Sequence, residues 1–344
     1  MIGIAYHEDY NKYDLGLDHP LIGNKPKKTI TYLKEKGLLK DIKIFKPKKS
    51  SENDLLRVHS SDYINRVKKL SQTGGMLSFD TPVPIGIYDI ARIATGGTIL
   101  TGKKIFDGFN CMINPLAGFH HASRNFSSGF CYFNDIAVLI EYLREKNNLK
   151  RFLVIDLDVH HANGTQEIYY NDPTVLNISF HQDGKTLYPG TGSLEKIGRD
   201  KGEGYTINLP LPPKTGNDSY LYCFEEIIPK ISLQFNSEII IYQCGVDTHH
   251  SDPLANLLLT HQIYYTLAKK IHYLSYKTCN KLVVLFGGGY NSQESIISYY
   301  NIMCGLLNKD NEYIKEQEIS DNKSAEIDKL VSNLKNKLKS YWEL

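Results

Sequence analysis

The sequence predicts a three-layer α/β fold with a mostly parallel sheet flanked by helices. Short apolar runs of strand length alternate along the chain with longer segments of helical periodicity. The clearest run, Phe152 to Ile155, is apolar without interruption, as strands covered on both faces are. Several runs end abruptly in polar residues, and that end of the strand is where open α/β sheets keep their functional groups.

The expected elements follow from these patterns in chain order. Apolar runs between turn signals predict strands at residues 2–6, 42–45, 111–113, 152–155, 175–180, 205–209, 238–244 and 281–286, with Pro210 closing the sixth. Helical spacing and capping residues predict helices at 28–39, from about 51, from about 88, from 134 or 135 through 143, at 218–235 and at 260–274. A last, peripheral helix is expected from the spacing of Ile327, Leu330, Leu334 and Leu338.

Length and composition are those of an ordinary globular protein. The chain has 344 residues, 41% of them hydrophobic and 23% charged, and a net charge of +2 that gives no argument for a nucleic-acid or membrane partner. The chain lacks an apolar run of roughly 20 residues and an amino-terminal signal-peptide pattern. Six cysteines without C-x-x-C spacing indicate buried free thiols, which fits a cytoplasmic enzyme. The sequence does not indicate an oligomeric state.

No internal repeat or low-complexity linker divides the chain. We therefore expect a single domain over residues 1–344, with its motifs at about 13–305 and a helical tail at about 308–344.

The stretch from Arg151 to Thr165, RFLVIDLDVHHANGT, is the most informative part of the chain. Asp158 and His160 alternate on an extended segment, so their side chains point to the same side and can hold one ion together. A helix N-cap followed by solvated loop residues is the alternative interpretation. Capping needs only one such residue, whereas this loop has Asp156, Asp158, His160, His161 and Asn163.

Three further strand ends carry polar groups in the same way. His120 and His121 follow the strand at 111–113, Asp247 follows the strand at 238–244, and Tyr290 follows a run of three glycines. Because the carboxyl ends of parallel strands share one edge of a sheet, we expect all these groups to meet there.

These residue types point to metal-assisted hydrolysis. Asp158, His160 and Asp247 would leave a tetrahedral ion with one open position, as in catalytic rather than structural zinc sites. Such a set would also accept Fe²⁺ or Co²⁺. Either His120 or His121 could accept the proton of the attacking water, and a tyrosine hydroxyl could stabilise the developing oxyanion. The sequence therefore predicts an amide hydrolase that works without a covalent intermediate.

The chain resembles the zinc-dependent histone deacetylase superfamily, which has the arginase/deacetylase fold. The resemblance rests on five ordered motifs, GFHHASRNFSSGFCYFND, VIDLDVHHANGT, YPGTG, GVDTHHSDPL and GGGYN, and extends from Tyr13 to about residue 305. Within the superfamily the sequence looks most like prokaryotic acetoin-utilisation-type deacetylases. The implied activity is removal of acetyl or other acyl groups from N-ε-acyl-lysine in proteins.

The resemblance also implies roles for individual residues. It implies zinc on Asp158, His160 and Asp247. His121 would be the general base and acid, and Tyr290 would stabilise the tetrahedral intermediate. His120 would be the electrostatic partner of His121. Asp156 would back His120, and Asn163 would back His121.

Further positions match the substrate and potassium sites of the superfamily. The acyl-lysine tunnel would be lined by Gly129, Phe130 and Tyr188, with Leu254 near its mouth and Asp80 on its rim. A structural K⁺ would be bound by side-chain or carbonyl oxygens of Asp156, Asp158, His160, Ser179 and Phe180.

Three positions depart from the pattern of the superfamily. Asn163 stands where many relatives have an aspartate, and an amide does not raise the basicity of the imidazole as a carboxylate would. The resemblance places Lys28 where relatives have an arginine that lines the acetate-release channel. A lysine keeps the positive charge but lacks the planar guanidinium group of arginine. Tyr188 replaces the commoner phenylalanine of the tunnel, which adds a hydroxyl that bears on acyl preference.

Other functions remain open at this point. An acetylpolyamine amidohydrolase would use the same chemistry on small acetylated amines, and a deacylase would act on longer acyl-lysines. A two-manganese ureohydrolase would need a second cluster of aspartates, whereas the 244–253 region offers only Asp247 and Asp252. A non-catalytic acyl-lysine binder would have no need of the metal ligands, the two histidines and Tyr290.

Overall fold

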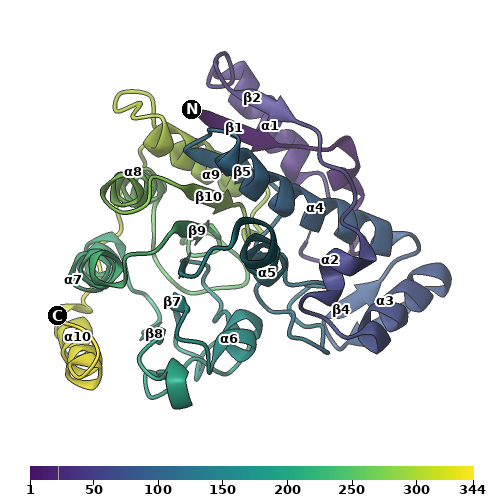
Figure 1. The fold of residues 1–344 in the computed structure, drawn as a ribbon. Helices are drawn as coiled ribbons and strands as arrows, with labels where there is room; N and C mark the ends of the chain where they lie inside the picture. Colours follow the sequence, from purple (N-terminus) through teal and green to yellow (C-terminus); the bar gives the residue numbers. More distant parts are fainter. Residues whose placement is uncertain (22) are drawn as a thin grey trace. The chain divides into compact units, whose positions relative to one another are not determined.

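The computed structural model of the chain describes residues 1–21 and 23–344 (Figure 1). It contains two compact units. Unit 1 comprises residues Met1–Lys150, Ala162–Ile168 and Val283–Gly287, and unit 2 comprises Arg151–His161, Tyr169–Leu282 and Gly288–Leu344. In each unit helices flank a parallel sheet, so the predicted α/β class is confirmed.

Unit 1 is built on four strands in the order β2-β1-β5-β10, with β1 parallel to both β2 and β5. A separate antiparallel pair is formed by β3 and β4. The strands are β1 (Ile2–Ala5), β2 (Lys43–Phe45), β3 (Gly75–Ser78), β4 (Thr81–Val83), β5 (Cys111–Asn114) and, but for its first residue, β10 (Leu282–Leu285). The helices are a 3₁₀ helix (Glu8–Lys12), α1 (Lys25–Glu35), α2 (Glu52–Leu56), α3 (Ser61–Thr73), α4 (Ile87–Phe106), α5 (Asp135–Asn147) and, but for its last residue, α6 (Asn163–Tyr169).

Capping residues fix where several of these helices begin. Ser51 and Asp54 form a reciprocal capping box at the start of α2. The Asn134 side chain accepts a hydrogen bond from the backbone N–H of Ala137 and starts α5, as predicted. Helix α1 begins three residues earlier than expected, because Pro26 is tolerated in the first turn.

Unit 2 carries four parallel strands in the order β9-β6-β7-β8. Every residue of β6, β7 and β9 is buried, which explains the apolar runs of β6 and β9. Strand β7 also buries polar residues, Ser179 among them. The strands are β6 (Phe152–Asp156), β7 (Val175–Gln182), β8 (Thr206–Leu211) and β9 (Ile239–Gln243). The helices are a 3₁₀ helix (Asp200–Gly202), α7 (Asn217–Phe235), α8 (His261–Lys277), α9 (Glu294–Leu306) and α10 (Ser324–Leu338).

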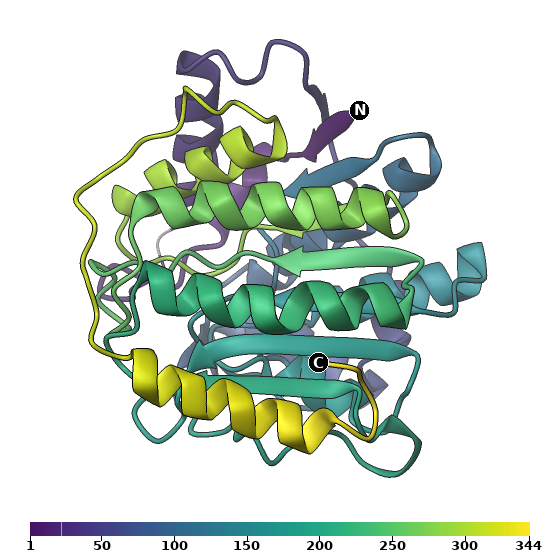
Figure 2. The same cartoon turned by 90° about the vertical axis from the view of Figure 1, so that its left-hand side faces the viewer.

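The C-terminal segment is packed onto unit 2. Figure 2 shows α10 lying alongside α7, and α10 contacts both α7 and β8. Its buried residues are Ile327, Val331, Leu334 and Leu338, so the predicted tail helix is confirmed with Val331 in place of Leu330 on the inner face. Beyond the helix, the Trp342 Nε1–H donates to the carbonyl oxygen of Gly204 at 2.8 Å.

Some element predictions were wrong. Strand β8 continues through Pro210. Because β8 is an edge strand, the backbone N–H that proline lacks is not needed for strand pairing there. Asn163 was assigned to the loop after the strand at 152–155, but it begins α6. Helices α3 and α9 were not predicted. Within the described residues, none of the helices has the length and apolar character needed to cross a membrane.

Candidate active site

Three side chains of unit 2 form a compact, buried group. Asp158 and His160 follow the end of β6, and Asp247 follows the end of β9, the strand paired with β6. One ligand atom from each of the three lies within 4.8 Å of the others. The His160 Nδ1 is 3.1 Å from Asp158 Oδ1 and 3.2 Å from Asp247 Oδ2. The structure thus brings together the three residues predicted to bind a metal.

Hydrogen bonds hold the two carboxylates in place. Asp158 Oδ2 accepts from the side-chain amide of Gln243 at 3.0 Å and from the backbone N–H of Gly288 at 3.1 Å. Asp247 Oδ1 accepts from the backbone N–H of Val159 at 2.9 Å. The other oxygen, Asp247 Oδ2, is buried and lacks a well-formed hydrogen bond among the described residues, because the His160 Nδ1–H at 3.2 Å is shared with Asp158 Oδ1. A buried acceptor without a well-formed hydrogen bond is costly, so this atom needs a cationic partner.

The electrostatics of the group also favour a cation. Burial lowers the pKa of His160, but the hydrogen bonds to the Asp158 and Asp247 carboxylates outweigh it and raise that pKa well above its usual range. Burial and the neighbouring Asp158 carboxylate raise the pKa of Asp247. Both shifts show that two carboxylates in one buried space hold positive charge tightly. Two carboxylate oxygens and one imidazole nitrogen fit a divalent metal with an open position.

Glycines let the backbone approach these ligands closely. A Cβ at Gly288 would lie 2.0 Å from Asp247 Oδ2, and a Cβ at Gly245 would lie 2.2 Å from Asp158 Oδ2. No other residue fits at either position without displacing a carboxylate. Within the glycine run before Tyr290, Gly288 is therefore required by packing against the ligands.

Tyr290 and Leu254 are positioned by one buried carboxylate. Asp252 accepts from the backbone N–H of Tyr290 at 2.7 Å and from that of Leu254 at 2.9 Å. The rings of Tyr290 and Tyr188 lie 6.5 Å and 6.1 Å from the His160 ring, measured between centroids. Both tyrosines and Leu254 are only partly buried. The two tyrosines predicted to act on substrate therefore both lie next to a predicted metal ligand.

The loop that carries Tyr188 is anchored by two histidines. The His161 Nδ1 lies 2.8 Å from Thr191 Oγ1, and the His181 Nε2–H donates to the carbonyl oxygen of Gly192 at 3.0 Å. A Cβ at Gly192 would clash with both imidazole rings. The second glycine of YPGTG is thus required by this packing.

The histidine pair lies in unit 1. His120 and His121 are both buried, with their Nε2 atoms 3.2 Å apart. His121 Nδ1 lies 2.6 Å from Asn163 Oδ1, so Nδ1 carries the proton and Nε2 keeps its lone pair. The chain around the pair is fixed by Asp135, which accepts from the backbone N–H groups of Gly118 and Phe119 at 3.1 and 2.8 Å. This arrangement leaves His121 Nε2 able to accept a proton.

The predicted rim and tunnel residues of unit 1 also lie together. Asp80 Oδ2 accepts from the backbone N–H of Gly129 at 3.0 Å. Gly129 has φ +55°, and a Cβ there would lie 2.0 Å from the His121 ring. Phe130 follows with φ +67°, and its carbonyl oxygen accepts from the Tyr13 hydroxyl at 2.8 Å. Asp80 therefore holds the backbone that packs on His121.

The residues predicted to bind potassium lie on adjacent strands of unit 2. Asp156, the last residue of β6, is the register partner of Ser179 on β7, and both are fully buried. Phe180 follows Ser179, and the Asp156 carboxylate also accepts from the backbone N–H of Asp158 at 3.2 Å. The structure places these residues beside the segment that carries Asp158 and His160.

The sequence and fold comparisons agree with this arrangement. Residues 19–306 match the histone deacetylase domain. The chain belongs to the histone deacetylase domain family. It is 37% identical to a "Probable deacetylase" of Archaeoglobus fulgidus, with 92% of this chain and 89% of the relative covered. It is 36% identical to the acetoin utilization protein AcuC of Bacillus subtilis, with 83% and 76% covered.

The structure resembles a solved structure over almost its whole length. The crystal structure of the HDA15 HD domain matches with a TM-score of 0.88 and 25% identity, covering 99% of this chain and 95% of that one. As a family member, this protein is a deacetylase, and the predicted resemblance is confirmed.

Several residues of this deacetylase were missed or misplaced by the sequence patterns. Gln243 holds Asp158, and its only sequence signal was a lone amide at the end of an apolar run. Asp252 holds Tyr290, and its only sequence signal was an aspartate in a turn. Lys28 is exposed, whereas the Nζ of Lys25 donates to the carbonyl oxygen of Gly287 at 3.0 Å. The lysine that reaches the glycine run is therefore Lys25, one turn earlier on α1.

Proposed function

We propose that this deacetylase is a zinc-dependent amidohydrolase that removes acetyl groups from N-ε-acetyl-lysine in proteins. The observation that carries the proposal is the buried group of Asp158, His160 and Asp247, in which the two carboxylates share the one His160 Nδ1–H and Asp247 Oδ2 has no well-formed hydrogen bond among the described residues. These three residues would hold the metal, for which Fe²⁺ or Co²⁺ are alternatives. When bound, zinc would supply Lewis-acid activation of the amide carbonyl and of the attacking water.

The histidine pair would move the protons. His121 Nε2, kept unprotonated by the Nδ1–H bond to Asn163, accepts the proton of the attacking water and passes it to the leaving lysine amine. His120, with Nε2 3.2 Å from His121 Nε2, stabilises the positive charge by sharing a proton in that contact. Asp156 is proposed as the acid behind His120.

The remaining predicted residues would bind and orient substrate. The Tyr290 hydroxyl donates to the developing oxyanion, from a loop fixed by Asp252. The acyl-lysine stem would lie along Gly129, Phe130 and Tyr188, with Leu254 and Asp80 at the entrance. Asp80 retains acceptor capacity for a substrate N–H, because a carboxylate can accept several hydrogen bonds.

A structural potassium ion is proposed between β6 and β7. The full burial of the Asp156 carboxylate beside the Ser179 hydroxyl supports it, together with carbonyl or side-chain oxygens of Asp158, His160 and Phe180. The six cysteines are free, which supports the expected cytoplasmic location.

The decisive experiment compares substrates on zinc-loaded protein. Steady-state rates would be measured on an acetyl-lysine peptide, on acetylputrescine and on a long-chain acyl-lysine peptide. We expect the acetyl-lysine peptide to have the highest kcat/KM and Tyr290→Phe to lower it by about 10²-fold or more. Tyr273→Phe, on the exposed side of α8, is the matched control and should keep the wild-type rate.

Each other outcome has a defined meaning. A preference for acetylputrescine would replace the protein substrate with a small acetylated amine and leave the mechanism in place. Peptide binding without turnover in the zinc-loaded wild type would support a non-catalytic acyl-lysine binder and overturn the proposal.

A further inference from the structure

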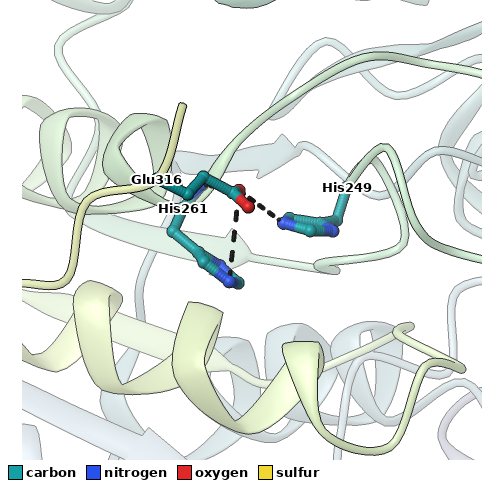
Figure 3. A group of neighbouring side chains, drawn as sticks. All are labelled: His249, His261 and Glu316. Atoms are coloured by element: carbon teal, nitrogen blue, oxygen red, sulfur yellow. Dashed lines mark hydrogen bonds and ion pairs between the residues drawn. The ribbon is translucent and has the colours of Figure 1, made fainter. Parts of the chain in front are cut away.

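A second group of possible metal ligands lies in unit 2, made of residues that the deacetylase chemistry above does not use. It consists of His249, His261 and Glu316, whose ligand atoms all lie within 4.8 Å of one another. Figure 3 shows both imidazole rings turned toward the Glu316 carboxylate. The His249 Nε2 lies 2.8 Å from Glu316 Oε1, and the His261 Nε2 lies 4.0 Å from the same oxygen.

Glu294, which contacts His261, is the candidate for a fourth ligand. Glu294 Oε2 lies 2.8 Å from the His261 Nε2. In a tetrahedral zinc site with metal–ligand bonds of 2.0–2.1 Å, neighbouring ligand atoms are about 3.3 Å apart. The observed separations of 2.8 and 4.0 Å lie on either side of this value, so small side-chain rotations would suffice to bind an ion.

The charge balance of the cluster favours a cation. The His249 and His261 side chains are 3% and 4% exposed, and those of Glu316 and Glu294 are 26% and 29% exposed. Throughout residues 1–21 and 23–344, the ion-pair partners of these two carboxylates are histidines, with no lysine or arginine among them. Two partly buried carboxylates therefore lack a permanently positive partner, which a divalent ion would supply.

The outer side of the His261 imidazole is arranged as in metal sites. Its Nδ1 lies 3.1 Å from Ser298 Oγ, and a hydroxyl that accepts the Nδ1–H leaves Nε2 with a lone pair directed at the ion. The His249 Nδ1 lies 2.8 Å from Ser251 Oγ and accepts from the backbone N–H of Ser251 at 3.3 Å, so metal binding would displace the proton by which His249 Nε2 contacts Glu316. Both Nε2 atoms face the cluster, so the two rings can ligate through the same type of atom.

The ligands stand on elements that hold them in place. His261 and Glu294 are the first residues of α8 and α9, two helices that pack against each other. Glu316 lies between α9 and α10, and its Oε1 accepts from the backbone N–H of His261 at 2.8 Å. Three of the four proposed ligands are therefore held by helix packing or by a backbone hydrogen bond.

We infer that His249, His261 and Glu316, with Glu294 as the fourth ligand, form a structural site for a divalent transition-metal ion, zinc being the best fit. Two imidazoles and two carboxylates close the tetrahedron, so the site has no open position for catalysis. Its role is to tie the segment around Glu316 to the start of α8 and to the loop after Asp247.

Metal counting on the full-length protein tests this inference. Metal-free protein would be dialysed against zinc, and bound zinc would be counted by plasma mass spectrometry. We expect two ions per chain in the wild type, one in Glu316→Gln and one in Asp158→Asn. Glutamine keeps the shape of Glu316 and its acceptor for the His261 N–H. Glu318→Gln, two residues along the same segment, is the matched control and should keep both ions.

The design separates this site from the proposed catalytic site. One ion that is lost in Glu316→Gln and kept in Asp158→Asn would support the structural site and contradict the catalytic one. One ion that is kept in Glu316→Gln, or no bound ion at all, would overturn the structural site and leave a plain histidine–glutamate hydrogen-bond network.

A second measurement tests the outer hydroxyl. In the Asp158→Asn background, Ser298→Ala should weaken zinc binding by about 10- to 100-fold in competition with a chelator, because His261 loses the partner that orients it. An unchanged affinity would contradict the inferred ligation by His261 Nε2.

Discussion

Asn163 decides how the proton of His121 is placed. Its amide oxygen accepts from Nδ1 at 2.6 Å, which orients the ring without adding charge. A carboxylate in the same position would orient the ring equally well and would also stabilise the imidazolium. Orientation and basicity of the proposed base are therefore separable in this protein by a single isosteric change.

Asn163→Asp should raise the pKa of His121 and move the acidic limb of the kcat/KM profile upward by about 1 to 3 pH units. The sign follows because the base must be unprotonated, and a higher pKa keeps it protonated to higher pH. The profile should be recorded from pH 5 to 10. Asn148→Asp, an exposed residue at the end of α5, should leave it unchanged. An unmoved limb in Asn163→Asp would exclude His121 as the titrating base.

The backbone of Gly129 packs closely against the His121 ring. An alanine Cβ would lie 2.0 Å from the ring, so Gly129→Ala must displace the imidazole. We expect kcat/KM to fall by about 10- to 100-fold, because a shift near 1 Å in a catalytic group costs that much. Gly108→Ala is the matched control, since it has positive φ but nothing within 4 Å of the added carbon. Equal activity losses in both variants would assign the effect to backbone strain alone.

At the residue scale, the sequence predicted the groups that act within one motif. Asp158 and His160 are two positions apart on one strand end, so their proximity could be inferred directly. Residues that act across the chain could not be found this way. Glu316 meets His249 across 67 positions and lies in a segment with no motif of its own. Lys25 and Lys28 belong to one KPKK cluster, and only helix geometry distinguishes the half-buried one from the exposed one.

Elements with strong periodicity were predicted well, and those with competing signals were not. The strands β6, β7 and β9 are buried along their whole length, and their positions agree with the prediction to within two residues. Asn163-Gly164 is a turn signal by composition, yet Asn163 starts α6 because its side chain is held by His121. Strand β8 contains a proline, which is tolerated because β8 is an edge strand. A local sequence pattern cannot indicate which strand lies at the edge.

Helix α10 offers a test of how firmly the C-terminal segment is attached. Leu334 is fully buried on its inner face, so Leu334→Ala should lower the free energy of unfolding by about 2 to 5 kcal/mol. Thermal denaturation monitored by circular dichroism would measure the loss. Asn333→Ala, on the exposed face, should cost nothing because alanine is the better helix former. A loss below 0.5 kcal/mol for Leu334→Ala would mean that α10 detaches before the rest unfolds.

At the scale of the whole molecule, the chain is interleaved between the two units. It passes from one to the other at residues 150/151, 161/162, 168/169, 282/283 and 287/288. Unit 1 takes α6 and most of β10 from segments that are surrounded in sequence by unit 2. A continuous fragment of residues 1–150 would lack β10, the neighbour of the fully buried strand β5.

This interleaving supports the predicted single domain, and scanning calorimetry can test it. We expect one transition with equal calorimetric and van't Hoff enthalpies, because neither unit can complete its sheet from one continuous stretch of chain. Residues 1–150 expressed alone should lack a cooperative transition, since β5 would expose apolar surface where β10 normally pairs. Two resolved transitions in the full chain, or a cooperatively folded fragment, would show that the units are independent domains and that the single-domain prediction is wrong.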